Sequence, residues 1–169
     1  GYPPLSLVVD QIGIYFDALK PSDLENLILE PECDELNIHA RNAIQTILKS
    51  GVTKYSQKFQ KIDSAKFYSQ SKNILVIDQT FGDQSIHYAG ATSDTFKKML
   101  QQACVDHPKA TIWVKTHPDV MAGKAEAHFT QQDLRHSQIK ILIEAYNPLE
   151  LLQHIDEVYV VSSQLGFEA

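Results

Sequence analysis

With 169 residues, a mass of 19.0 kDa and 43% hydrophobic residues, the chain is long and apolar enough to fold as one domain, or as one domain and part of another, and is not disordered. Its formal net charge of −6 argues against non-specific binding of nucleic acid, which needs a basic surface. Two cysteines, Cys33 and Cys104, do not make a disulfide framework, so we expect reduced thiols and a cytosolic chain.

The N-terminal end is predicted to be extended. Residues 5–9 (LSLVV) are typical of a strand that Asp10 and a turn at Gly13 close, and Ile14–Phe16 adds a second short extended piece. The end GYPPLSLVVD lacks the basic region and the long apolar stretch of a signal peptide, and no apolar run reaches the length of a membrane span. Because the chain opens on a strand-like segment and stops inside a helix start, LGFEA, we expect it to be a fragment of a longer protein.

Two helices are expected next. Ser22 can cap a helix that begins after it, and Glu25, three residues later, is its partner in a capping box. Residues 36–50 place apolar side chains at helical spacing, and Gly51 ends that helix. Residues 52–72, rich in Lys, Gln and Ser, are typical of a connector with weak helical preference.

From residue 73 onward, strands and helices alternate. Strands are predicted at residues 74–77, 111–114, 139–143 and 158–161. A helix capped by Ser93 or Asp94 separates the first two strands and ends before Pro108, and Pro148 at the first helical position opens another helix. This alternation predicts an α/β fold with a Rossmann-like parallel sheet and crossover helices.

Three segments bring polar residues to the expected ends of strands. They are residues 73–85 (NILVIDQTFGDQS), 111–120 (TIWVKTHPDV) and 158–169 (VYVVSSQLGFEA). Each begins with a β-branched apolar run and then breaks into Gly, Asp, His-Pro or Ser-Ser. Open α/β sheets bind ligands at the carboxyl ends of their strands, so we expect these polar groups to converge on one crevice. Together the three segments indicate a nucleotide-sugar site.

Two carboxylates, Asp78 and Asp83, flank the turn QTFG. A carboxylate held at a strand end can act as a nucleophile or as a general base at a sugar carbon, and Gly82 lets the backbone approach a ligand closely. The alternative is structural: Asp83 caps a turn, and Asp78 ends a strand by hydrogen bonding to nearby amides. The spacing of the two residues leaves both interpretations open.

His117 follows a predicted strand and precedes Pro118, which restricts the backbone beside it. A histidine held in this way can donate a proton or a hydrogen bond to a leaving phosphate, and Lys115, on the same side of the strand, can add positive charge. The alternative is a surface histidine without a role. The other histidines lack the paired spacing of a zinc site: His39, His87, His107, His128, His136 and His154.

Ser162 and Ser163 end the last predicted strand and precede a helix start. Serine hydroxyls and the first free amides of a helix can bind an anion, although an ordinary N-cap uses the same residues. The sequence contains no GxGxxG motif, no P-loop and no DxD pair of the kind that many metal-dependent glycosyltransferases use.

Taken together, IDQTFGDQSI, VKTHPDV and VVSSQLGFEA resemble the KpsC type of bacterial capsule-polysaccharide protein, which transfers Kdo (3-deoxy-D-manno-octulosonic acid) to a lipid. The stretch PPLSLVVDQIGIYFDALKPSDLE is similar to the same family, so the resemblance covers nearly the whole chain. Of the two transferase modules in many members, the form QTFGD is closer to the first. The resemblance implies a retaining enzyme with a two-Rossmann, GT-B-like architecture, CMP-Kdo as its donor and a lysophosphatidylglycerol-type acceptor.

The resemblance also implies roles for individual residues. Asp83 corresponds to the catalytic nucleophile, and His117 to a residue that contacts the phosphate of the donor. Ser162 and Ser163 correspond to a pair that holds the phosphate of CMP. Further candidates for donor binding are Gln79, Thr80, Gly82, Lys115 and Gln164, with Asp78 and Asp119 as secondary candidates. No metal is expected, and no cofactor beyond the donor substrate.

We expect residues 1–70 to be the end of an N-terminal domain with a helical connector, and residues 71–169 to be most of the C-terminal, donor-binding half. An N-terminal Rossmann half and a GxPFYAGWG-like segment of the family are absent here, so the stretch alone is expected to be inactive. The expected partners are CMP-Kdo, a phospholipid or glycolipid acceptor, and the capsule assembly and export machinery at the cytoplasmic side of the inner membrane.

Two alternatives remain open. The first is a non-catalytic module that binds a nucleotide sugar or takes part in capsule assembly. The second is a GT-B enzyme, an epimerase or a transferase, that uses CMP-sialic acid or another nucleotide sugar in the same crevice.

Overall fold

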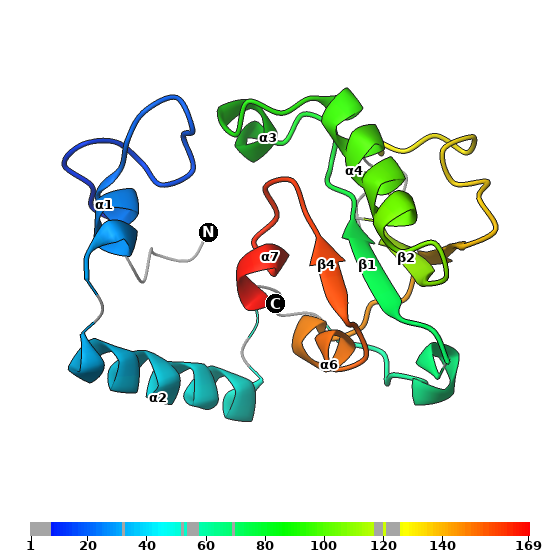
Figure 1. Ribbon diagram of the computed structural model, residues 1–169, viewed down its shortest axis with the longest axis horizontal. Helices are drawn as coiled ribbons and strands as arrows, with labels where there is room; N and C mark the ends of the chain where they lie inside the picture. Colours follow the sequence, from blue (N-terminus) through cyan, green and yellow to red (C-terminus); the bar gives the residue numbers. More distant parts are fainter. Residues whose placement is uncertain are drawn as a thin grey trace.

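A four-stranded parallel sheet lies at the centre of the C-terminal part of the protein (Figure 1). The structure is a computed structural model, and it describes residues 8–31, 33–51, 53, 58–68, 70–116, 120 and 126–169. The strands are β1 (Asn73–Ile77), β2 (Thr111–Lys115), β3 (Ile139–Leu142) and β4 (Glu157–Tyr159). Their order in the sheet is β3-β2-β1-β4, and all neighbours run parallel. The α/β fold expected from the sequence is therefore confirmed.

Helices lie between these strands and after the last one. They are α3 (Gln84–Tyr88), α4 (Ser93–Asp106), α6 (Pro148–Leu152) and α7 (Leu165–Glu168), and a 3-10 helix (Ser64–Phe67) precedes β1. Pro148 takes the first helical position of α6, as expected. The prediction that Ser93 or Asp94 caps α4 is wrong, because the helix begins at Ser93. Its N-cap is Thr92, whose backbone N–H donates to Oγ1 of Thr95, while the Ser93 hydroxyl contacts a histidine from another segment.

Two strands are shorter than their patterns predict. β3 ends at Leu142, one residue early, and β4 ends at Tyr159, two residues early. The early end of β4 has a physical reason. The backbone bends at residues 161–162, where the N–H of Ser162 donates to the side chain of Gln79 instead of continuing the ladder with β1.

The sheet is buried between two apolar clusters, one on each face. Four strand residues face the cluster under α3 and α4: Ile74, Val76, Ile112 and Val114. Four face the cluster under the 3-10 helix and α6: Leu75, Ile77, Trp113 and Leu142. Side chains alternate between the faces of a strand, so a strand covered on both sides is apolar along its whole length. Figure 1 shows α4 on one side of the sheet and α6 with α7 on the other.

The N-terminal part contains two helices that bury no side chain, α1 (Asp23–Leu29) and α2 (Asp34–Ser50). The predicted capping box is confirmed, because the N–H of Glu25 donates to Oγ of Ser22 at 3.2 Å and the N–H of Ser22 donates to Oε2 of Glu25 at 2.8 Å. Gly51 ends α2 in a left-handed conformation with φ of 63°, also as expected. Of the helices that the structure describes, none has the length and apolar character needed to cross a membrane.

The extended pieces expected before α1 do not form. Ile14–Phe16 lies in a turn, and residues 8–9 belong to no strand; the rest of that expected strand lies outside the described residues. The reason is Asp10, whose Oδ1 accepts from the N–H groups of Ile12 and Gly13 and bends the backbone. The turn then packs on α3, with the ring centroids of Phe16 and Tyr88 5.6 Å apart.

Candidate functional site

Side chains that follow β1 and β4 meet in a closed hydrogen-bond network. Gln79 comes two residues after β1 and is only 6% exposed. Its Nε2 donates to Oγ of Ser162 at 3.0 Å, and its Oε1 accepts from the backbone N–H of Ser162 at 3.1 Å. The Oγ atoms of Ser162 and Ser85 are 3.0 Å apart. The network therefore joins the end of β1, the start of α3 and the turn after β4.

Asp83 stands beside this network at the N-cap of α3. Its Oδ1 accepts from the backbone N–H of Ser85 at 2.9 Å, and the residue is exposed. Gly82 before it has a φ of 82°, which L side chains rarely adopt. The capping role is therefore present, and it leaves the second carboxylate oxygen to meet a ligand. The role of Asp83 as a nucleophile stays a prediction.

Ser162 and Ser163 lie between β4 and α7, at the same edge of the sheet as Gln79 and Asp83. The two serines differ in their contacts. Gln79 engages both the hydroxyl and the N–H of Ser162, whereas Oγ of Ser163 accepts from the N–H of Leu165 at 3.3 Å. A phosphate at this turn would therefore meet Ser163 and nearby backbone amides before it met Ser162. Gln164, the N-cap of α7, is exposed and makes no side-chain capping bond.

Asp78 directly follows β1 and is 2% exposed. Its Oδ1 accepts from the N–H of Gln79 at 2.9 Å and from the N–H of His128 at 3.3 Å, whereas Oδ2 is buried without a hydrogen-bond partner. Burial raises the pKa of Asp78 from its ordinary value of 3.8 to about 6, against the opposing effect of the two N–H groups. A carboxyl group with this pKa exchanges its proton close to neutral pH, as a general acid or base must.

His128 belongs to the same site, although its sequence pattern does not indicate a role. Its ring stacks on Phe96, with centroids 4.0 Å and planes 3° apart, and its Nδ1 lies 3.0 Å from Oγ of Ser93. Burial lowers the pKa of His128, which favours the neutral imidazole. The exposed ring of Phe81 lies 5.5 Å from the imidazole. The backbone N–H of His128 therefore contacts the carboxylate of Asp78, and its imidazole lies beside the exposed ring of Phe81.

One signal in the sequence could have indicated this burial. His128 is flanked by Ala127 and Phe129, and Phe129 is buried in the cluster under α4. Phenylalanine is among the residues most often buried, so Phe129 favours a turn that packs on the core. The imidazole is the polar group that this turn brings inside.

Lys115 is held apart from the network of Gln79. It ends β2, and its Nζ donates to the backbone carbonyl of Glu144 at 3.1 Å. Burial lowers the pKa of Lys115, and the charge of Glu144 opposes this effect. Thr80 is half-buried, and its carbonyl accepts from the N–H of Asp83 at 3.1 Å. The expected site residues His117 and Asp119 lie outside the described residues.

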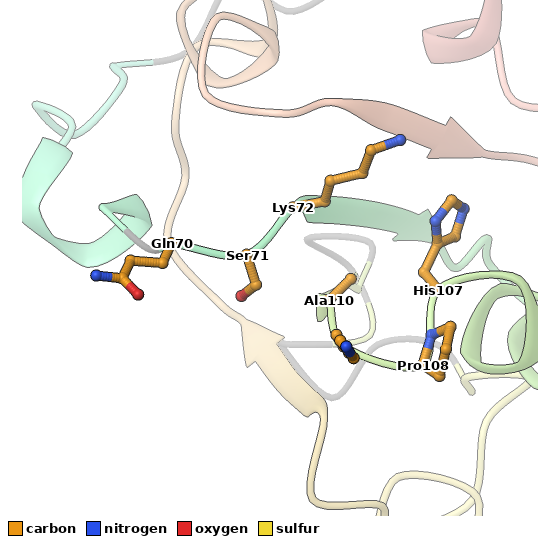
Figure 2. A pocket seen from close by; sticks show the side chains of 7 residues that line it. Gln70, Ser71, Lys72, His107, Pro108 and Ala110 are labelled. Carbon is orange, nitrogen blue, oxygen red and sulfur yellow. The ribbon is translucent and has the colours of Figure 1, made fainter.

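A surface hollow of about 400 Å³ lies at the opposite end of the sheet (Figure 2). It is lined by residues 70–72, which precede β1, and residues 107–110, which precede β2. Figure 2 shows the Lys72 side chain reaching toward β4, where its Nζ is 2.7 Å from a carboxylate oxygen of Glu157. Ligands of open α/β sheets bind at the carboxyl ends of the strands, so chemistry and topology favour the network over this hollow.

No cluster in the described ranges, which omit residues 117–119 and 121–125, places three or more His, Cys, Asp or Glu side chains so that they could hold a metal ion.

The family model for capsule polysaccharide biosynthesis protein matches residues 39–169. The chain belongs to this family. Capsule polysaccharide modification protein LipA of Neisseria meningitidis serogroup A is 47% identical over 173 residues, and lipopolysaccharide-processing protein LpsZ of Rhizobium meliloti is 34% identical over 170 residues. These alignments cover 100% and 98% of the chain, but only 24% and 38% of the two relatives. The chain thus spans well under half the length of these curated relatives.

Two solved structures are also similar. The Thermosulfurimonas dismutans KpsC beta Kdo 2,4 transferase matches with a TM-score of 0.83 and 40% identity, over 98% of this chain and 52% of that chain. The beta Kdo 2,7 transferase of the same name and organism matches with a TM-score of 0.67 and 28% identity, over 98% and 49%. These matches confirm the resemblance to the KpsC type and the GT-B-like fold class. The division into residues 1–70 and 71–169 stays a prediction.

Proposed function

We propose that this chain is the donor-binding part of a retaining glycosyltransferase that moves Kdo from CMP-Kdo to a lipid acceptor during capsule polysaccharide assembly. The observation on which the proposal rests is the match to the 2,4 transferase, at 40% identity over 98% of the chain. The match to the 2,7 transferase is weaker, at 28% identity. We therefore expect the 2,4 linkage in the product.

The donor is proposed to bind where the polar groups gather at the carboxyl ends of β1 and β4. Asp83 lies exposed at the start of α3, and Ser163 lies in the turn before α7. The hydrogen bonds among Gln79, Ser85 and Ser162 hold these two segments together. One substrate can therefore meet a carboxylate from one segment and phosphate-binding groups from the other.

The proposed reaction has two displacements. In the first, a carboxylate oxygen of Asp83 forms a bond to the anomeric carbon of Kdo while the bond from that carbon to the phosphate oxygen breaks, and CMP leaves with the electron pair. In the second, the acceptor hydroxyl attacks the same carbon, the ester bond to Asp83 breaks, and the hydroxyl proton passes to a general base. Two displacements at one carbon retain its configuration.

The departing phosphate gains negative charge as its bond breaks, so groups that bind it best at that moment accelerate the step. The Ser163 hydroxyl and the amides of the turn before α7 are proposed to supply these contacts. His117, from the family resemblance, is proposed to add a proton or a hydrogen bond. No step requires a metal or a cofactor beyond CMP-Kdo.

The acceptor is proposed to be a phospholipid or glycolipid of the lysophosphatidylglycerol type. The complete enzyme would then act at the cytoplasmic side of the inner membrane, with the capsule assembly and export machinery. Residues 71–169 would bind the donor, while the acceptor would need the rest of the polypeptide. The isolated stretch is therefore expected to bind CMP without transferring Kdo.

The direct test is an incubation of the full-length polypeptide that contains these residues with CMP-Kdo and a Kdo-primed lipid acceptor. Mass spectrometry is expected to detect one added Kdo, and parallel incubations with CMP-sialic acid and UDP-sugars are expected to give no product. Transfer from one of those other donors would contradict the Kdo assignment. Binding of CMP-Kdo without any transfer would instead support a non-catalytic module.

A further inference from the structure

Both polar atoms of the Gln79 side-chain amide form hydrogen bonds. Its Nε2 donates to Oγ of Ser162 at 3.0 Å and lies 3.4 Å from Oγ of Ser85, while its Oε1 accepts from the N–H of Ser162 at 3.1 Å. The residue is 6% exposed. An amide that is buried and paired at both ends has little capacity left for a ligand.

A glutamine suits this position for a chemical reason. The backbone N–H of Ser162 needs an acceptor, because β4 has already ended and no ladder partner is available to it. The hydroxyls of Ser85 and Ser162 lie 3.0 Å apart, and a single N–H donor group reaches both. Only a side chain with an acceptor and a donor at the same end can serve all three groups.

We propose that Gln79 is a positioning residue, whose amide fixes the turn after β4 against the start of α3 so that Ser163 and Asp83 face one donor molecule. This inference rests on the proposed function of the same site. It changes the role expected for Gln79 from a contact with the nucleotide sugar to a contact that acts through Ser162. It also makes Ser162 part of the support rather than a direct ligand of phosphate.

The test uses a double-mutant cycle in the full-length polypeptide, with CMP as the probe and calorimetry as the measurement. The variants are Gln79→Met, Ser162→Ala and the combination of the two. Gln79→Met keeps the shape and removes both hydrogen-bonding groups, so we expect CMP affinity to fall about tenfold. Because the two residues act through one contact, the combined variant should lose no more affinity than the weaker-binding single variant.

A matched control exists at the other end of the sheet. The amide of Gln138 donates to the backbone carbonyls of His107 and Ala110 at 2.8 and 3.2 Å, so it too ties segments together. Gln138→Met should lower the melting temperature and leave CMP affinity unchanged. If CMP affinity is equal in the unmodified protein, Gln79→Met and Gln138→Met, then Gln79 only stabilises the fold, and the proposal is overturned. Losses that add in the combined variant would show that Gln79 contacts the nucleotide itself, and would also overturn it.

Hydrogen exchange separates this inference from the proposed function. In Gln79→Met the peptide covering residues 158–166 should exchange faster than in the unmodified protein, with or without CMP, because the N–H of Ser162 has lost its acceptor. Unchanged exchange there would overturn the inference even if CMP bound normally. Failure of the unmodified protein to bind CMP would contradict the proposed function, and with it the role of the contact in donor binding. If Gln79→Met does not fold, Gln79→Asn, one methylene too short to span the contacts, replaces it with the same expected results.

Discussion

Buried polar groups at the two ends of the sheet differ in how completely they are hydrogen-bonded. At the amino ends they are paired: Asn73, at the start of β1, accepts from the indole N–H of Trp113 at 2.9 Å and donates to the carbonyl of Phe67 at 2.8 Å. At the carboxyl ends pairing is incomplete. Within the described part of the chain, the buried side-chain atoms without a hydrogen-bond partner are Asp78 Oδ2, His128 Nε2 and Glu144 Oε2. All three residues follow a strand or contact the end of β1.

The pairing at the amino ends extends to His107, which lines the hollow of Figure 2. Nε2 of His107 lies 3.1 Å from the hydroxyl of Tyr159, which donates to Asp106 at 2.9 Å. Burial, followed by the hydrogen bond to Asp106, raises the pKa of Tyr159 to about 12. These contacts tie the end of α4 to β4, and they use the polar groups that a ligand would otherwise need.

This difference in hydrogen bonding distinguishes polar groups that stabilise the fold from polar groups that are candidates for binding a ligand. A paired buried polar group supports the fold, whereas an unpaired one costs about 1–3 kcal/mol and calls for another explanation. A ligand site is such an explanation, because its polar groups find their partners when the ligand binds. We therefore interpret the hollow at the amino ends as part of the framework and keep the carboxyl ends as the proposed ligand site, in agreement with the rule for open α/β sheets.

The largest effect is expected from Asp83→Ala in the full-length polypeptide. Loss of a nucleophile should lower the rate of Kdo transfer by several orders of magnitude, while loss of a helix cap costs only about 1 kcal/mol of stability. Asp63→Ala is the matched control, since Asp63 caps the 3-10 helix on the other side of β1 and its Oδ1 accepts from the N–H of Ala65 at 3.1 Å. If Asp83→Ala transfers Kdo as fast as Asp63→Ala, Asp83 is not the nucleophile, and Asp78 becomes the next candidate.

The next effect concerns the amino end alone. Asn73→Ala would leave the indole N–H of Trp113 and the carbonyl of Phe67 without partners in a buried place, so the free energy of unfolding should fall by about 2–4 kcal/mol. CMP affinity, measured well below the melting temperature, should not change. A large loss of CMP affinity in the folded variant would break the separation between the two ends.

A smaller, pH-dependent effect is expected from Asp78→Asn. Because burial raises the pKa of Asp78 from 3.8 to about 6, the folded protein holds a proton in this window that the unfolded chain releases. The contribution of this group to the free energy of unfolding is therefore complete below pH 3.8 and is lost as the pH rises through 6. At about 1.4 kcal/mol per pH unit, the total loss is at most roughly 3 kcal/mol.

The asparagine cannot titrate, so it should be nearly as stable as the aspartate protein at pH 4 and more stable at pH 7.5. Urea unfolding of both proteins at the two pH values measures this difference, and groups common to both cancel. A stability difference that is independent of pH would mean that Asp78 keeps an ordinary pKa, and that its unpaired oxygen is not a functional feature.

Local patterns predicted the framework well. The strand at β1, the capping box of Ser22 and Glu25, and the end of α2 at Gly51 depend on neighbours within a few residues, and all are confirmed. The predictions that failed depend on distant contacts. Ile14–Phe16 has the side chains of a strand, but the turn set by Asp10 and the packing on α3 decide its conformation.

The candidate site shows the same limit. Its strand-end residues are visible in the sequence because apolar runs stop at Asp78 and Ser162. Their partners are not visible, since Gln79 and Ser162 are 83 residues apart and the backbone of His128 reaches Asp78 across 50 residues. The sequence therefore predicts where polar groups gather, while the structure shows which of these groups are hydrogen-bonded to one another.

The most direct test is hydrogen exchange of the full-length polypeptide with and without saturating CMP-Kdo. Bound donor should slow exchange in peptides covering residues 79–88 and 160–168, at the carboxyl ends of β1 and β4. Peptides covering residues 64–73 and 106–111, around the hollow at the amino ends, should exchange at the same rate in both conditions. Protection of the amino-end peptides instead, or of neither set, would contradict the assignment of the ligand site to the carboxyl ends of the sheet.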